Sequence, residues 1–186
     1  MYEITTPTYK VVFVGESNVG KTSILNQMVD WKFDPSENVT IAAGFFTKNV
    51  TINGNECILN IWDTAGQEKY RNVVDLYFRD ISVVVIVFDV SNHSSYQMIS
   101  YWIEIVKNKA PENVKIIICG NKIDLVDDRE VFIGEMPHPY IETSAKTGIG
   151  VSALLDLIII QIRNLYNIKD GKSRQLNSND SESGCC

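Results

Sequence analysis

The chain has 186 residues, of which 45% are hydrophobic and 22% charged, and its formal net charge is −6. These values fit one globular domain with a sizeable core and a short tail. The negative charge argues against nonspecific binding to nucleic acid or anionic lipid. The two histidines, His93 and His138, lack the spacing of a metal cluster. The polar first residues and Tyr2 in place of glycine argue against a signal peptide and myristoylation, so we expect a cytosolic protein.

Apolar runs and helical repeats alternate along the chain. The run YKVVFVG, which begins at Tyr9, is typical of a strand buried on both faces of a sheet, and a helix is expected over residues 21–29. The dipeptide Asn53-Gly54 is a strong hairpin signal between two further strands. The remaining predicted elements are strands at 81–88, 114–120 and 140–143 and amphipathic helices at 99–106 and 151–165.

This alternation predicts an α/β fold with a mostly parallel six-stranded sheet, one antiparallel hairpin and helices on both faces. In such sheets the ligand binds at the carboxyl ends of the strands. We expect a single domain over residues 1–168. From Lys169 onwards apolar residues nearly vanish, so residues 169–186 are predicted to form a disordered tail.

The segment GESNVGKT, from Gly15 to Thr22, matches the pattern G-x-x-x-x-G-K-[ST] between the first predicted strand and helix. In that place backbone N–H groups can hold phosphates, Lys21 can reach the β- and γ-phosphates, and the Thr22 hydroxyl can bind Mg²⁺. A plain glycine-containing turn is the alternative interpretation. The residues expected at the phosphates are Ser17, Asn18, Val19, Gly20, Lys21, Thr22 and Ser23.

The segment IWDTAGQE carries a second group of candidate residues. Asp63 ends a predicted strand, where its carboxylate can hold Mg²⁺ through water. Gly66 can offer a backbone N–H to the γ-phosphate. Gln67 has an uncharged side chain that can orient an attacking water, which makes it the candidate catalytic residue. A turn-forming Asp-Thr pair is the alternative interpretation.

Two later segments, GNKID and ETSAK, each follow a predicted strand and predict which base is bound. Asp124 can accept hydrogen bonds from N1–H and the 2-amino group of guanine. Adenine would leave this acid unpaired, which argues against an ATP-dependent kinase or ATPase. Asn121 is expected at N7 of the guanine and the Ala145 N–H at O6, and Lys122 and Lys146 are expected beside the ring. The residues expected around the base are Asn121, Lys122, Asp124, Ser144, Ala145 and Lys146.

Together these motifs resemble those of small GTPases of the Ras superfamily, and WDTAGQEKY, LYFRD and VIVFDVSN are similar to segments of the Rab family. The resemblance covers about residues 8–168 and resumes at the last two residues. It implies a P-loop GTPase fold, GTP and GDP as ligands, and Mg²⁺ as cofactor. It further implies that Thr40 joins the Mg²⁺ shell in the GTP state and that Phe33 lies across the guanine.

The same resemblance implies partners. Phe45, Trp62 and Tyr77 match the family's hydrophobic effector surface, although ordinary core packing is an alternative for Trp62. The family also implies an exchange factor, a GTPase-activating protein, a lipid-extracting escort of the GDP dissociation inhibitor type, a role in vesicle transport, and a monomer without nucleic acid. The segment DPSENV, residues 34–39, contains no arginine, which predicts slow hydrolysis without a partner. A non-hydrolysing GTP-binding scaffold is the alternative function.

Cys185 and Cys186 match the paired cysteines on which Rab proteins are prenylated. Two unburied thiols have no structural role in a reducing compartment, and two lipid chains give durable membrane attachment. Since residues 169–182 carry three basic and three acidic side chains, they add no polybasic attraction. We therefore expect a protein on the cytoplasmic face of endomembranes that cycles with the cytosol.

The chain departs from the Rab pattern at several places, including the phosphate loop, the stretch TIAAGF, Lys69 and the segment after Asp124. Ser17 and Asn18 stand where the family often has glycine. The stretch between Asp124 and Glu142 is shorter than usual, and Gly134, Pro137 and Pro139 interrupt it. Because proline breaks helices, the helix expected there should be shortened to a turn or two.

Overall fold

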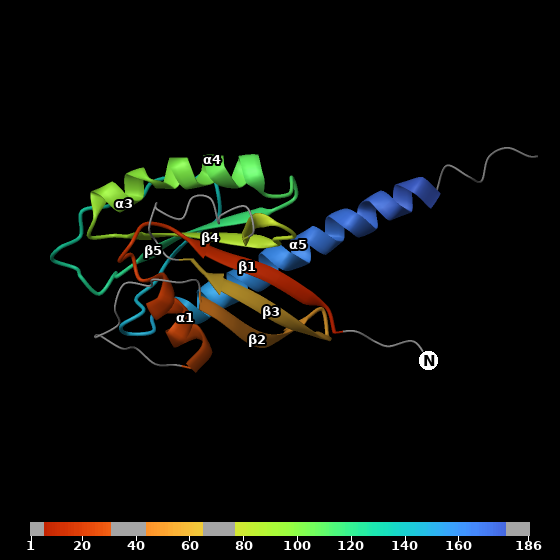
Figure 1. Cartoon of the computed structure of the whole chain (residues 1–186), viewed down its shortest axis with the longest axis horizontal. Helices are drawn as coiled ribbons and strands as arrows, with labels where there is room; N and C mark the ends of the chain where they lie inside the picture. Colours follow the sequence, from red (N-terminus) through yellow and green to blue (C-terminus); the bar gives the residue numbers. More distant parts are fainter. Residues whose placement is uncertain (1–5, 31–43, 65–76, 178–186) are drawn as a thin grey trace, which may run out of the picture.

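The computed structural model describes residues 6–30, 44–64 and 77–177, with the backbone alone for 166–177. Its described part contains a six-stranded sheet in the order β2-β3-β1-β4-β5-β6, in which only the β2–β3 pair is antiparallel (Figure 1). This confirms the predicted α/β fold with one hairpin. The strands are β1 (Thr8–Val14), β2 (Gly44–Ile52), β3 (Asn55–Asp63), β4 (Val83–Asp89), β5 (Lys115–Asn121) and β6 (Tyr140–Glu142); the helices are α1 (Lys21–Asp30), α3 (His93–Gln97), α4 (Ile99–Lys109) and α5 (Val151–Asn177).

The sheet follows from the sequence pattern. All seven residues of β4 are buried, as expected for a parallel strand covered on both faces. β2 instead alternates between half-buried and exposed positions, as an edge strand of a hairpin does. The hairpin turns at Asn53 and Gly54, whose φ angles of 52° and 79° are the positive values that a tight two-residue turn requires. The predicted hairpin is confirmed.

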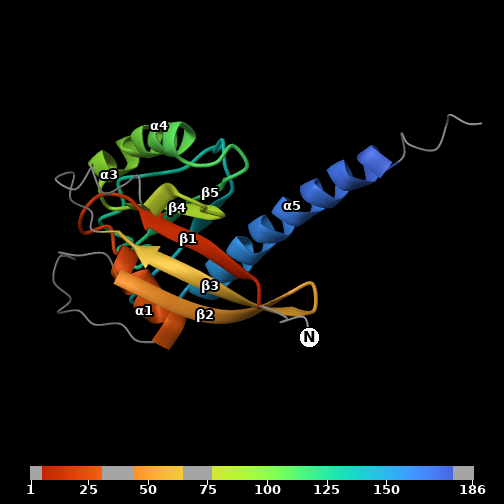
Figure 2. The same ribbon diagram turned by 45° about the vertical axis from the view of Figure 1, so that its right-hand side comes forward.

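Helices cover both faces of the sheet (Figure 2). One face packs against α1 and α5, whose stripe of Val151, Leu154, Ile158 and Ile162 is fully buried. The other face packs against α4 through Ile99 and Val106. Cys57 and Cys119 are buried free thiols. With both faces covered, the carboxyl edge of the central strands is left for a ligand.

The segment between β5 and β6 corrects one prediction. Residues 122–139, all of which are described, contain turns, a bend and irregular backbone but no helix, where a shortened helix was expected. Pro137 and Pro139 cannot donate helical hydrogen bonds, and Gly134 weakens any helix before them. The buried Val131 and its neighbour Glu130 instead donate their backbone N–H groups to the Val90 carbonyl, both at 3.0 Å. The segment is therefore fastened to the end of β4.

Helix α5 continues past the predicted helix of residues 151–165 as far as Asn177 (Figure 1). Residues 169–177 were predicted to be disordered, but they hold no proline and a single glycine among helix-favouring lysine, arginine, glutamine and leucine. Extending an existing helix adds one hydrogen bond per residue without a new nucleation cost. Such extension explains a helix without the apolar stripe that the prediction relied on.

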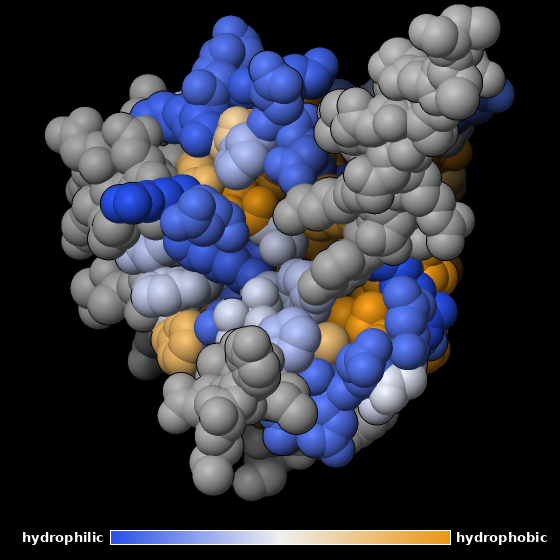
Figure 3. All heavy atoms as spheres, turned by 90° about the vertical axis from the view of Figure 1, so that its right-hand side faces the viewer, coloured by the Kyte–Doolittle hydropathy of each residue, from blue (hydrophilic) through white to orange (hydrophobic). Residues whose placement is uncertain are grey.

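The face at the right-hand side of Figure 1 is shown in Figure 3, where hydrophilic side chains dominate and apolar ones appear in separate patches between them. Among the helices of the described ranges, none combines the length and apolar character needed to cross a bilayer.

Candidate functional site

The predicted nucleotide-site residues that the structure describes lie at the carboxyl ends of neighbouring strands. The phosphate loop follows β1, Asp63 ends β3, Asn121 ends β5, and the ETSAK segment begins in β6. The parallel register therefore brings segments that are far apart in the sequence to one edge of the sheet. Of the other predicted site residues, Phe33, Thr40, Gly66, Gln67, Cys185 and Cys186 lie outside the described residues.

Lys21 lies at the start of α1, and its side chain is turned back into the phosphate loop. Its Nζ donates to the carbonyl oxygens of Gly15 at 3.0 Å and Glu16 at 2.8 Å, and the residue is only 5% exposed. Burial lowers the pKa of this ammonium to about 8, while the carboxylates of Asp63 and Glu16 raise it. A buried cation at a helix N-terminus forms an anion site suited to phosphate.

The phosphate loop needs special backbone conformations. A side chain on Gly15 would bring its Cβ to 2.1 Å from the Val87 carbonyl oxygen, so only glycine fits against β4 there. Asn18 has a φ of 67°, which asparagine tolerates better than most residues because its short amide can bond locally. The departure from glycine at this place thus keeps the loop's conformation. Ser17 and Asn18 are both exposed at the loop's tip.

The residues expected to hold Mg²⁺ come together. The Thr22 hydroxyl donates to the Asp63 carboxylate, although the two residues are 41 positions apart. Asp63 is fully buried at the end of β3. A hydroxyl and a carboxylate are hard oxygen donors of the kind that Mg²⁺ prefers, with its other positions left to water and phosphate. The donors present therefore fit the ion.

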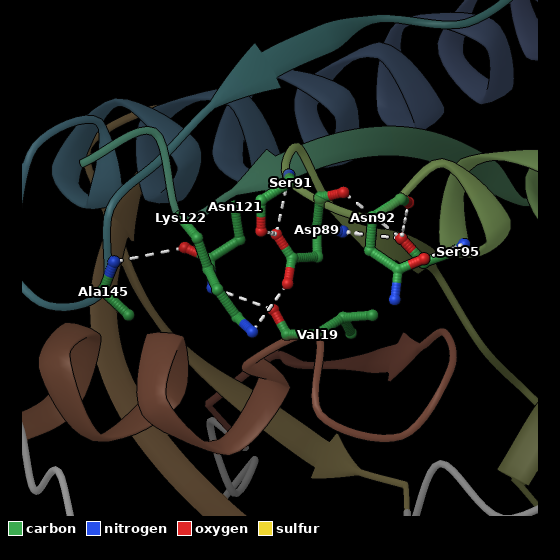
Figure 4. A network of polar contacts seen from close by, with 8 residues as sticks. All are labelled: Val19, Asp89, Ser91, Asn92, Ser95, Asn121, Lys122 and Ala145. Carbon is green, nitrogen blue, oxygen red and sulfur yellow. Dashed lines mark hydrogen bonds and ion pairs between the residues drawn. The ribbon is translucent and has the colours of Figure 1, made fainter. Parts of the chain in front are cut away.

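Asn121, at the end of β5, links the phosphate loop to the ETSAK segment (Figure 4). Its Nδ2 donates to the Val19 carbonyl oxygen in the phosphate loop at 2.9 Å. Its Oδ1 accepts from the Ala145 N–H and from the Thr143 hydroxyl, both at 3.1 Å. Asn121 and Ala145 were predicted to meet N7 and O6 of the base; in this structure they bond to each other. The amide is therefore a structural tie as well as a candidate base contact.

Asp124 is held at the same edge by the ETSAK segment. Its Oδ1 accepts from the Ser144 hydroxyl at 2.6 Å, and its Oδ2 lies 4.0 Å from the Lys146 ammonium. The Asp124 side chain is 15% exposed, so the carboxylate is shielded from most of the solvent but can still be reached. The structure thus brings together five residues that the sequence suggested for the base, namely Asn121, Asp124, Ser144, Ala145 and Lys146.

Asp89 was not among the predicted site residues, yet it holds Lys122. Its Oδ2 lies 2.6 Å from the Lys122 ammonium, while its Oδ1 accepts from the Ser91 N–H and hydroxyl (Figure 4). Lys122 itself has a φ of 68°, so its backbone as well as its side chain is fixed in an uncommon state. The signal that could have found Asp89 is an acid that ends a fully apolar buried strand, since a carboxylate there needs a partner.

Ser95 completes this network from the next helix. Its hydroxyl accepts from the Asp89 N–H at 3.0 Å and donates to the Asn92 carbonyl at 2.8 Å. Asn92 caps α3, because its side chain accepts from the Ser95 N–H. The start of α3 is therefore tied to the backbone of Asp89, whose carboxylate pairs with Lys122.

The three predicted effector aromatics form one group on the surface. The ring centroids of Phe45 and Trp62 are 4.9 Å apart, and those of Trp62 and Tyr77 are 5.6 Å apart. Phe45 is 53% exposed on β2, whereas Trp62 is half-buried and packs against the core on the α4 side. Trp62 therefore belongs partly to the surface group of aromatic residues and partly to the core packing, the two interpretations that the sequence left open.

A family model described as "Ras: Ras family" matches residues 10–164. The matched stretch contains the phosphate loop, Asp63, Asn121, Asp124 and the ETSAK segment, and it spans well over half of the chain.

Proposed function

Because the chain belongs to the Ras family of small GTPases, we propose that it is a Rab-type switch that cycles between GTP and GDP and recruits effectors for vesicle transport. The observation that carries the nucleotide part is the single polar network that joins the phosphate loop to the base-reading segments through Asn121. A Rab-type role is supported by the segments WDTAGQEKY and VIVFDVSN and by the adjacent cysteines Cys185 and Cys186.

Each part of the site has a task in this proposal. The Lys21 ammonium exchanges its two carbonyl partners for phosphate oxygens, and the first N–H groups of α1 add further donors. Asp124 accepts hydrogen bonds from guanine. Thr22 and Asp63 hold Mg²⁺, which when bound neutralises charge on the phosphates. Gln67 orients the attacking water, and Thr40 marks the GTP state.

Single-turnover hydrolysis by the purified chain tests the enzymatic part. With Mg²⁺ and no partner, we expect a rate below about one per minute, because no arginine lies in residues 34–39 to stabilise the transferred charge. Gln67→Leu should slow it further while leaving GTP affinity unchanged. Rapid turnover that ignores Gln67→Leu would overturn the mechanism. Absence of hydrolysis even with a GTPase-activating protein would favour the GTP-binding scaffold.

Localisation of a tagged full chain in cells tests the membrane part. We expect the double variant Cys185→Ser/Cys186→Ser to be cytosolic and to bind GTP normally. Each single variant should attach less durably than the parent, since one lipid chain gives only marginal binding. Membrane residence of the double variant would refute the proposed anchor, and residence away from endomembranes would refute the transport role.

A further inference from the structure

In addition to the contacts of Asp124 at its start, the helix-free segment of residues 122–139 reaches the ETSAK segment (residues 142–146, the base-reading loop) through the side chain of Arg129. Its guanidinium donates to both oxygens of the Glu142 carboxylate, through Nη1 at 3.1 Å and through Nη2. The Arg129 Nε donates to the Val131 carbonyl at 2.9 Å, so a third hydrogen bond fixes the orientation of the guanidinium. A bidentate pair of this kind is directional as well as attractive.

Glu142 has a second partner in β6. The Tyr140 hydroxyl donates to its Oε1 at 2.7 Å. The Arg129 guanidinium holds the pKa of the Glu142 carboxyl below its usual value, so Glu142 is ionised at neutral pH. The side chains of Arg129 and Glu142 are only 23% and 31% exposed, which limits the screening of their attraction by water.

A short path of contacts leads from Glu142 to the residues expected at the guanine. Thr143, the next residue, donates its N–H to the Gly120 carbonyl and its hydroxyl to Asn121. Ser144 then donates to Asp124, and the Ala145 N–H donates to Asn121. The position of Glu142 therefore limits where the next three residues, Thr143, Ser144 and Ala145, can lie.

The backbone next to Arg129 is also fixed. The N–H groups of Glu130 and Val131 bond to the end of β4, and the Glu130 carboxylate accepts from the His93 N–H at the start of α3 at 2.8 Å. Arg129 thus projects from a segment anchored on two elements. A clamp held in this way can restrain the base-reading loop, whereas a mobile arginine could not.

We propose that Arg129 is a positioning residue that holds the base-reading loop through Glu142 and thereby sets how slowly guanine nucleotide is released. This inference rests on the proposed GTP/GDP-binding function and adds a residue outside its motifs. In this proposal Arg129 acts through Glu142 and not through a contact of its own with the nucleotide. Its loss should let the ETSAK segment move, so that release accelerates while association, which depends mainly on the phosphate loop, changes little.

The test is the rate of release of a fluorescent ribose-labelled GDP from the full chain in the presence of Mg²⁺. We expect Arg129→Ala to accelerate release by about tenfold. Arg129→Lys keeps the positive charge but cannot make the two parallel hydrogen bonds, and it should accelerate release by a smaller factor. Glu142→Gln should reproduce the effect, and the double variant should release no faster than either single one. Arg163→Ala removes an exposed arginine on α5 and serves as the matched control.

A second measurement separates positioning from a loss of general stability. Inosine diphosphate lacks the 2-amino group that Asp124 is expected to bind, so the ratio of GDP to inosine diphosphate affinities reports the geometry around Asp124. Arg129→Ala should bring this ratio of affinities closer to one. A lower melting temperature with an unchanged ratio and release rate would mean a merely structural role and would overturn the inference.

The outcomes also separate this inference from the proposed function. If the wild-type chain fails to retain labelled GDP, the proposed function fails first, and the inference fails with it. If the wild type retains GDP and Arg129→Ala releases it at the wild-type rate, only the inference fails. Should Arg129→Ala not fold, the release rate of Glu142→Gln decides in the same way.

Discussion

Replacing Asn121 by alanine tests whether this residue ties the site together before any nucleotide binds. The side chain is 1% exposed and bonds to Val19 in the phosphate loop and to Thr143 and Ala145 in the base-reading segment. If Asn121 only touched the base, its loss would weaken nucleotide binding without affecting the empty protein. The observed contacts predict that the empty protein is destabilised too.

The size of the effect follows from the groups left behind. The Ala145 N–H loses its acceptor and the Val19 carbonyl loses a donor, both in buried surroundings, whereas the Thr143 hydroxyl keeps the Cys119 thiol at 3.3 Å. A buried polar group left unsatisfied costs about 1–3 kcal/mol, and water that enters the space of the missing amide recovers part of that. We therefore expect a loss of about 2–4 kcal/mol, a large share of a typical domain stability of about 5–15 kcal/mol.

Urea unfolding of the full chain, stripped of nucleotide with a chelator, measures this loss directly. Asn164→Ala is the matched control, because Asn164 is exposed on α5 and alanine is the better helix former. Its stability should change by less than about 0.5 kcal/mol. A similarly small change for Asn121→Ala would show that the three contacts do not hold the nucleotide-free site, and the reasoning from them would be wrong.

Three further predictions concern other parts of the site. Asp124→Asn exchanges an acceptor for a donor and should shift preference from GTP towards XTP; unchanged GTP affinity in a competition assay would refute the assigned role of Asp124. Gly150→Ala should lower the melting temperature far more than Gly54→Ala: both have positive φ, but a Cβ at Gly150 would lie 2.1 Å from the Glu142 carbonyl oxygen, while Gly54 has open space. Equal shifts would contradict this. The pKa of Glu142 is lowered in the folded state, so the stability that its ionised form contributes should be fully present above the unfolded pKa of about 4.5 and be lost as the pH falls through the folded pKa. The difference in unfolding free energy between wild type and Arg129→Ala should therefore shrink below about pH 4.5. A difference that stays constant with pH would exclude Glu142 as the partner of Arg129.

The sequence predicted those features that local pattern controls. Apolar runs located the strands, the Asn53-Gly54 pair located the hairpin, and the phosphate-loop pattern located Lys21 and Thr22 at the start of α1. Because parallel strands end at one edge of a sheet, the position of Asp63 and Asn121 beside that loop also followed. These inferences need only neighbouring residues and the topology.

The remaining features depend on contacts that local pattern does not encode. Asp89 and Lys122 are separated by 33 positions in the sequence, so the ion pair becomes visible only when β4 and β5 lie side by side. The prolines after Asp124 indicated a weakened helix, but the backbone bonds to Val90 that replace the helix depend on the end of another strand. The helical residues 169–177 were missed for the opposite reason: the prediction required an apolar stripe, and helix propensity alone supports the extension.

Asn121 also makes nucleotide binding and folding parts of one equilibrium. The network joins the phosphate loop and the base-reading loop through a single buried amide, so a conformation that separates the two loops removes partners from Val19 and Ala145. A ligand that occupies both loops keeps these contacts formed and stabilises the fold by an amount that grows with the logarithm of its concentration over its dissociation constant. Arg129 is placed where it can oppose separation of the two loops, because its pair with Glu142 restrains the loop that Asn121 joins to the phosphate site.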